Sequence, residues 1–139
     1  LIKSLDDGDA RTIEVIVISD FSGGGRIGES FIGSDRSSVR NVVLMDRAGI
    51  GARRSSATLA HEIGHVILDV PGHPDDFGID TPTRLMDSDA ADASAFGPRR
   101  LTLDECAQAM RQSGPSGPLP LLRPGFSPEK EPRKEIGRR

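Results

Sequence analysis

The sequence is poor in aromatic residues and in cysteine. Its 139 residues include no tryptophan, no tyrosine and a single cysteine, Cys106. One cysteine excludes an internal disulfide framework. Basic residues are not gathered on a stripe with aromatic residues between them, which is how nucleic-acid-binding surfaces are built. Nucleic acid is therefore not expected as a partner.

Long hydrophobic runs are also missing. The longest apolar stretch, residues 13–18, is interrupted by Glu14 and is far shorter than the ~20 residues that a membrane-spanning helix needs. The formal net charge of −3 is small. We therefore predict a soluble chain without a membrane span.

Proline is unevenly distributed along the chain. Six of the ten prolines fall in residues 113–139, together with few residues that a core can bury. Such a composition does not offset the entropy lost on folding, so we predict a Pro/Gly-rich flexible tail over residues 113–139. The length of the remainder suits one modest core, and we predict a single folded domain over residues 1–112.

Three short segments have the composition of strands. Residues 13–19 form a β-branched run bounded by turn residues, and residues 30–33 and 42–45 are two further candidates. The mostly apolar character of the first segment favours a central place in the sheet. Residues 74–100 are rich in proline, glycine, aspartate and serine, which predicts a loop.

The hydrophobic period changes after residue 55. Apolar residues recur every three or four positions over residues 56–69, which predicts a helix. Ser55 or Ser56 can cap its start. Pro71 and Gly72 are expected to end it, because proline removes a backbone donor and glycine permits a reversed backbone.

A second helix is predicted over residues 103–112. Thr102 and Glu105 have the spacing of a capping box, in which each side chain bonds to the backbone of the other. Leu101 and Cys106 stand at the two positions of a hydrophobic staple. Cys106 is therefore expected to be a buried packing residue.

Residues 61–65 read His-Glu-Ile-Gly-His inside the first predicted helix. Positions four apart on a helix differ by about 40° in azimuth and one turn in height, so His61 and His65 can share a metal ion. Glu62 lies about 100° round the helix, where its carboxylate can reach a metal-bound water without ligating the metal. The pattern predicts a zinc centre for peptide hydrolysis, with Glu62 as general base.

A catalytic zinc usually has three protein ligands, so a third must be found. His73 follows the predicted end of the helix, where the chain can turn back toward the metal. Asp75 and Asp76 are reserve candidates, because carboxylates also ligate zinc. Asp69 continues the helical series but lies about 12 Å along the axis from His61, which is too far.

Together with its flanking residues, this motif resembles the metzincin metallopeptidases. That family carries His-Glu-x-x-His-x-x-Gly-x-x-His, followed by a Met-turn beneath the zinc. Residues 57–65 resemble the active-site helix, and the stretch Leu85-Met86-Asp87 resembles the Met-turn.

The resemblance extends over about residues 10–112. Other similar segments are residues 28–33 and 42–46, which match the strands before the helix, and residues 102–105, which match the start of the last helix. Two departures stand out. Leu68 occupies the family's glycine position, and seven residues instead of five separate His65 from His73.

The resemblance implies an α+β, zincin/metzincin-like catalytic domain over residues 1–112. A small mixed, twisted sheet would pack on the active-site helix, with a C-terminal helix below. The implied function is that of a zinc-dependent metalloendopeptidase, whose polypeptide substrate lies in extended form against a sheet edge. Its cofactor would be Zn2+. The resemblance alone favours a secreted or exported protein.

The same resemblance implies the roles of the site residues. His61, His65 and His73 would bind the metal, and Met86 would be the methionine of the Met-turn. The chain has no tyrosine to offer to a tetrahedral intermediate, so zinc and backbone donors are expected to stabilise the oxyanion.

Two other functions stay open from the sequence. One is a catalytically silent, zinc-stabilised binding module of a larger secreted or injected protein. The other is a zinc hydrolase that acts on a non-peptide amide. Glu62 argues against the silent module, because a purely structural zinc site has no need of a carboxylate at that position.

Overall fold

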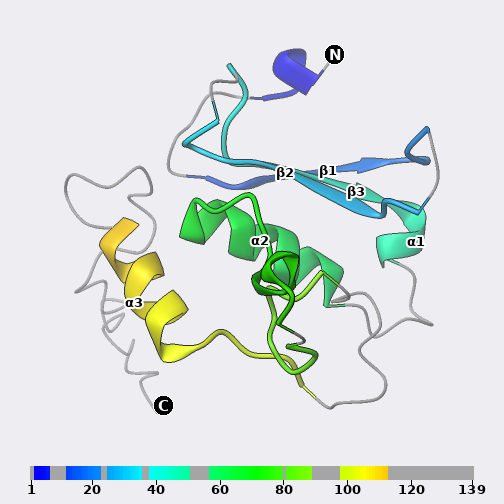
Figure 1. Ribbon diagram of the computed structural model, residues 1–139. Coiled ribbons are helices and arrows are strands. Elements are labelled where there is room, and N and C mark those ends of the chain that lie inside the picture. Colours follow the sequence, from blue (N-terminus) through cyan, green and yellow to red (C-terminus); the bar gives the residue numbers. More distant parts are fainter. Residues whose placement is uncertain are drawn as a thin grey trace, which may run out of the picture.

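The computed structural model describes most of the chain between residues 2 and 112 (Figure 1). The described parts are residues 2–6, 12–22, 25–35, 38–50, 57–79, 81–88 and 98–112. The predicted tail over residues 113–139 lies outside them, as do the predicted helix caps Ser55 and Ser56.

Three strands form a mixed sheet in this part of the chain. They are β1 (Glu14–Ile18), β2 (Gly28–Phe31) and β3 (Val42–Asp46). Their order is β1-β3-β2, with β1 parallel and β2 antiparallel to β3. Together with two longer helices, this sheet confirms the predicted small α+β fold.

The strand predicted over residues 13–19 is β1, but it lies at an edge of the sheet and not at its centre. Val15 and Val17 expose 41% and 55% of their surface. The prediction was wrong because a β-branched run does not by itself distinguish a strand with one open face from one covered on both faces. The central strand is β3, in which all five residues are buried.

The longest helix, α2 (Thr58–Leu68), begins two residues later than predicted. Its N-cap is Ala57, which makes no side-chain capping bond. The helix ends at Asp69, whose backbone is left-handed, with φ 55° and ψ 43°. The expectation that Pro71 and Gly72 end the helix was therefore wrong. Aspartate is one of the few non-glycine residues that tolerate this conformation.

The helix lies along one face of the sheet (Figure 1). Side chains of β3 alternate between two apolar clusters, because successive strand residues point to opposite faces. Val43 and Met45 pack with Val66 of α2, whereas Val42 and Leu44 enter the cluster on the other face. Shorter helical turns are η1 (Ile2–Ser4), before β1, and α1 (Arg47–Ile50), directly after β3.

The second long helix, α3 (Leu103–Gln112), carries the predicted capping box. The Thr102 backbone N–H donates to Glu105 Oε2 at 2.6 Å, and the Glu105 N–H donates to Thr102 Oγ1 at 3.2 Å. Gln108 Nε2 donates to the Leu68 carbonyl at 2.7 Å. This bond satisfies a carbonyl at the end of α2 and ties the two helices together.

Cys106 is exposed, so the prediction that it packs in the core was wrong. The protected positions of α3 are 105, 108, 109 and 112, with Ala109 the buried one. These positions follow the helical period, and residue 106 lies about 100° away from Glu105 around the axis. The staple pattern at the start of the helix did not reveal which face meets α2.

Among the described residues, no helix is both long and apolar enough to cross a bilayer.

Candidate metal centre

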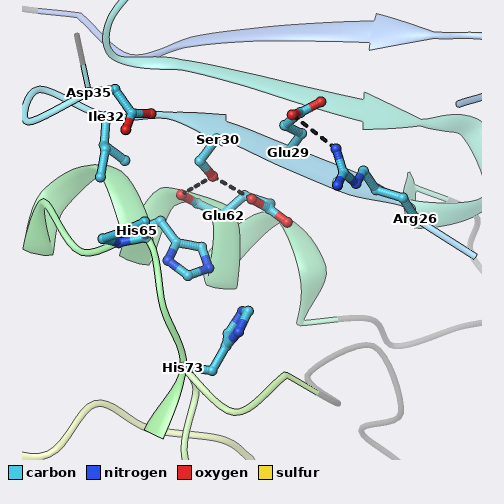
Figure 2. A pocket seen from close by; sticks show the side chains of 10 residues that line it. Arg26, Glu29, Ser30, Ile32, Asp35, Glu62, His65 and His73 are labelled. Atoms are coloured by element: carbon cyan, nitrogen blue, oxygen red, sulfur yellow. Dashed lines mark hydrogen bonds and ion pairs between the residues drawn. The ribbon is translucent and has the colours of Figure 1, made fainter. Parts of the chain in front are cut away.

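Three histidines converge in front of α2. His61 and His65 both belong to α2. Figure 2 shows His65 on the helix and His73 on the loop beyond it. The Nε2 atom of His61 lies 3.0 Å from Nε2 of His65 and 3.2 Å from Nε2 of His73. In the described part of the chain, these histidines form a group whose ligand atoms all lie within 4.8 Å of one another. Such a group can hold a metal ion.

The loop brings His73 to the site through a turn made just after the helix. Asp69 is left-handed, and the Val70 N–H donates to the His65 carbonyl at 3.3 Å. His73 is extended and begins the 3-10 turn η2 (Pro74–Phe77). The chain therefore reverses at Asp69. This is one residue after Leu68, which stands where the metzincin pattern has glycine.

Asp76 fixes His73 from within the same turn. Its Oδ2 accepts the His73 backbone N–H at 2.7 Å and lies 3.6 Å from Nδ1 of the ring. Asp76 thus accepts a hydrogen bond from the His73 backbone and lies near the Nδ1 edge of the His73 ring. Its carboxylate does not belong to the three-histidine group.

Backbone carbonyls orient the other two rings. Nδ1 of His61 lies 2.7 Å from the Leu85 carbonyl oxygen, and Nδ1 of His65 lies 2.6 Å from that of Val70. A carbonyl can only accept, so each Nδ1 carries the proton and each Nε2 presents a lone pair to the centre. This is the tautomer that outer hydrogen bonds impose on metal-binding histidines.

Burial favours the neutral form of these rings. It lowers the pKa of His61 to about 4, against the opposing effect of the Leu85 carbonyl, and the nearby positive groups, Arg99 among them, lower it further. Burial also lowers the pKa of His65. Neutral imidazole is the form that binds metals, so the two rings are held ready as ligands.

Glu62 lies beside the histidines with only 8% of its surface exposed. Burial raises the pKa of its carboxyl group, and a hydrogen bond from Ser30 opposes that shift. The Ser30 hydroxyl contacts Glu62 Oε2 and lies 2.9 Å from the Glu62 carbonyl oxygen (Figure 2). A buried carboxylate with a raised pKa is suited to accept a proton near neutral pH.

Met86 is buried, with 2% of its surface exposed. It packs with Leu68 and Ala109, which links α2 to α3. Its sulfur lies against Gly64, where a β-carbon would overlap it. Leu85, the residue before it, supplies the carbonyl that orients His61. The segment around Met86 therefore packs against α2 and orients His61.

We expect Gly64→Ala to destabilise the protein. A glycine-to-alanine change inside a helix normally gains about 1 kcal/mol. Here the added methyl group meets the Met86 sulfur, and overpacking of this kind costs about 1–3 kcal/mol. Thermal unfolding of the metal-free protein measures the effect. The Gly64→Ala/Met86→Val double variant should lose less than the two single variants added together, and a Gly64→Ala variant as stable as the parent would contradict the packing.

Asp75, the other reserve ligand, is engaged away from the histidines. Its Oδ1 accepts the Ser88 backbone N–H at 3.0 Å, and its Oδ2 accepts the Ser88 hydroxyl. Burial acts to raise the pKa of Asp75, but these bonds outweigh it and the pKa is lowered. The carboxylate thus ties the turn that follows His73 to the segment that follows Met86.

Several contacts around the site were not predicted from the sequence. Asp87 accepts hydrogen bonds from the backbone N–H and hydroxyl of Thr81, and its Oδ1 lies 3.7 Å from the buried guanidinium of Arg99. Ser30 lies 32 positions before Glu62. No spacing rule connects residues so far apart, so only the folded chain reveals these contacts.

Comparison of the chain with protein-family models, curated proteins and solved structures finds no match. The chemistry of the site is therefore inferred from the chain's own side chains.

Proposed function

We propose that the protein is a zinc-dependent metalloendopeptidase of the metzincin type, with His61, His65 and His73 as metal ligands and Glu62 as general base. One observation carries the proposal. Nε2 of His61 lies close to Nε2 of both His65 and His73, and a buried carboxylate lies next to this group. A zinc site with a purely structural role has no use for that carboxylate.

Two of the three distances between the nitrogen atoms are close to the value expected for zinc, and the three ligand atoms lie within 4.8 Å of one another. Ligands at the usual Zn–N distance of about 2.0–2.1 Å in a tetrahedron are about 3.3 Å apart. The Nε2 atoms here are 3.0 and 3.2 Å apart. With both protons on Nδ1, the lone pairs of His61 and His65 face each other, an arrangement that a shared cation stabilises. Three histidines leave the fourth tetrahedral position for water or substrate.

Each residue of the proposed site has a separate role in peptide hydrolysis. Bound zinc would lower the pKa of a water molecule to about 7 and polarise the scissile carbonyl. Glu62 would accept a proton from a water molecule that attacks the carbonyl carbon, and would deliver it to the amine nitrogen as the C–N bond breaks. His61, His65 and His73 would hold the ion, while the residues behind them fix the rings.

A cleft of about 220 Å³ runs between β2 and the His73 loop. Its lining includes Ser30, Glu62, His65 and His73 (Figure 2). Gly28 also lines it. The edge strand β2, Glu62 and two of the three histidines thus line the same cleft, which supports an extended peptide as the ligand.

The pairing of β2 shows which of its backbone groups point away from β3. The Asp46 N–H donates to the Ile27 carbonyl at 3.1 Å, so Ile27 and Asp46 form a hydrogen-bonded pair. Antiparallel pairs alternate, and the groups of Gly28 and Ser30 therefore point away from β3. These are the groups that an added strand would bond to, which supports an extended polypeptide as substrate.

A cleavage assay tests the proposal. Zinc-loaded protein, incubated with unfolded casein or a mixed peptide library, should produce new amino termini that mass spectrometry detects. A chelator should abolish cleavage, and added zinc should restore it. Stoichiometric zinc binding without cleavage would instead favour a silent, zinc-stabilised binding module. Hydrolysis of small amides but not of peptides would favour the non-peptide hydrolase.

A further inference from the structure

The β2 strand presents a serine and a glycine to Glu62. The Ser30 hydroxyl contacts Oε2 of the carboxylate. Two positions earlier, on the same face of the strand, Gly28 lies against the other side of that group. A β-carbon at Gly28 would be 2.5 Å from Oε1 and 2.7 Å from Cγ of Glu62. The strand thus closes around the carboxylate, with a hydroxyl on one side and bare backbone on the other.

We propose that Ser30 is a positioning residue for the general base and that Gly28 is required to leave space for it. This inference rests on the proposed role of Glu62. A free glutamate side chain samples several staggered rotamers. The hydroxyl of Ser30 and the closed space beside Gly28 select one of them, and so fix the carboxylate beside the three histidines.

The bond from Ser30 leaves the base free to act. A carboxylate has about four lone-pair sites, and one hydroxyl proton occupies a single site on Oε2. The remaining sites can accept the proton of a water molecule. The same hydroxyl also lies 2.9 Å from the Glu62 carbonyl oxygen, and its one proton can go to either oxygen, so both acceptors within its reach belong to Glu62. Strand and helix are therefore joined at the position of the base.

Steady-state kinetics of the zinc-loaded protein separates positioning from binding. Ser30→Ala should lower kcat by about 10–100-fold, because a misplaced group costs rates of this order, while KM and zinc affinity stay within about twofold. Ser30→Thr keeps the hydroxyl and suits a strand, so it should recover most of kcat. Gly28→Ala keeps Ser30 but displaces the carboxylate, and should also lower kcat. The control is Ser34→Ala, which removes an exposed hydroxyl after the same strand.

A second readout does not depend on activity. In zinc-free protein, the carbon-13 resonance of the Glu62 carboxyl group should shift in Ser30→Ala and stay near its parental value in Ser30→Thr. Unchanged kcat in both Ser30→Ala and Gly28→Ala, or an unshifted resonance in Ser30→Ala, would overturn the positioning role. Absence of hydrolysis by the parent protein would overturn the proposed function instead, and the resonance would still test the contact.

Discussion

Replacement of His73 by alanine is expected to release zinc and abolish activity. In the proposed site, His61 and His65 supply two ligands from α2, and the third comes from the returning loop. A two-ligand site should bind zinc at least about a thousandfold more weakly, a loss of about 4 kcal/mol. Metal content, measured by mass spectrometry after dialysis against a mild chelator, checks the expectation.

The neighbouring aspartates provide graded controls for His73→Ala. Asp75→Asn should keep zinc, because that carboxylate bonds to Ser88. Asp76→Asn should weaken zinc binding by about 10–100-fold, since Asp76 orients the His73 ring without binding the metal. Full zinc content in His73→Ala, together with its loss in either aspartate variant, would replace the three-histidine site by one with two histidines and a carboxylate.

Glu62→Gln is expected to lower kcat by about 10²–10⁴-fold while zinc remains at one equivalent. The amide has nearly the shape of the carboxylate and can still accept a bond from Ser30, but it cannot take a proton from water. The three ligands are untouched. Activity assays and metal analysis of the same preparation therefore separate loss of the base from loss of the metal.

Glu14→Gln is the matched control for this change, because Glu14 lies on β1, at the sheet edge opposite β2. It should keep parental kcat and zinc content. If Glu62→Gln were as active as the parent, Glu62 would have no part in the mechanism. The burial of its carboxylate would then need a structural explanation.

The sequence predicted those parts of the site that depend on local geometry. The spacing of His61 and His65 follows from the helical period, and the capping box of α3 depends on residues three positions apart. The contact between Ser30 and Glu62 joins a strand to a helix, and no local pattern encodes it. Packing of the whole chain decides such contacts.

The failed predictions share a cause. Composition assigned β1 to the centre of the sheet, and the staple pattern assigned Cys106 to the core. Both patterns indicate that a residue tends to be buried, but they do not show which neighbouring element covers it. The end of α2 was predicted to within one residue, but the residue that reverses the chain was not: glycine and proline were expected in that role, yet Asp69 adopts the left-handed conformation.

The turn at Asp69 has a consequence for how metal sites of this kind are recognised in sequences. A search pattern with a fixed number of residues before the third histidine fixes the length of the intervening loop. Metal binding depends instead on the positions of the ligand nitrogen atoms. Asp76 lies three residues after His73 and accepts its backbone N–H. This interaction therefore does not depend on the length of the loop that precedes His73. Patterns that allow this interval to vary, and that require an acidic residue three positions after the histidine, would retrieve chains that a rigid spacing rejects.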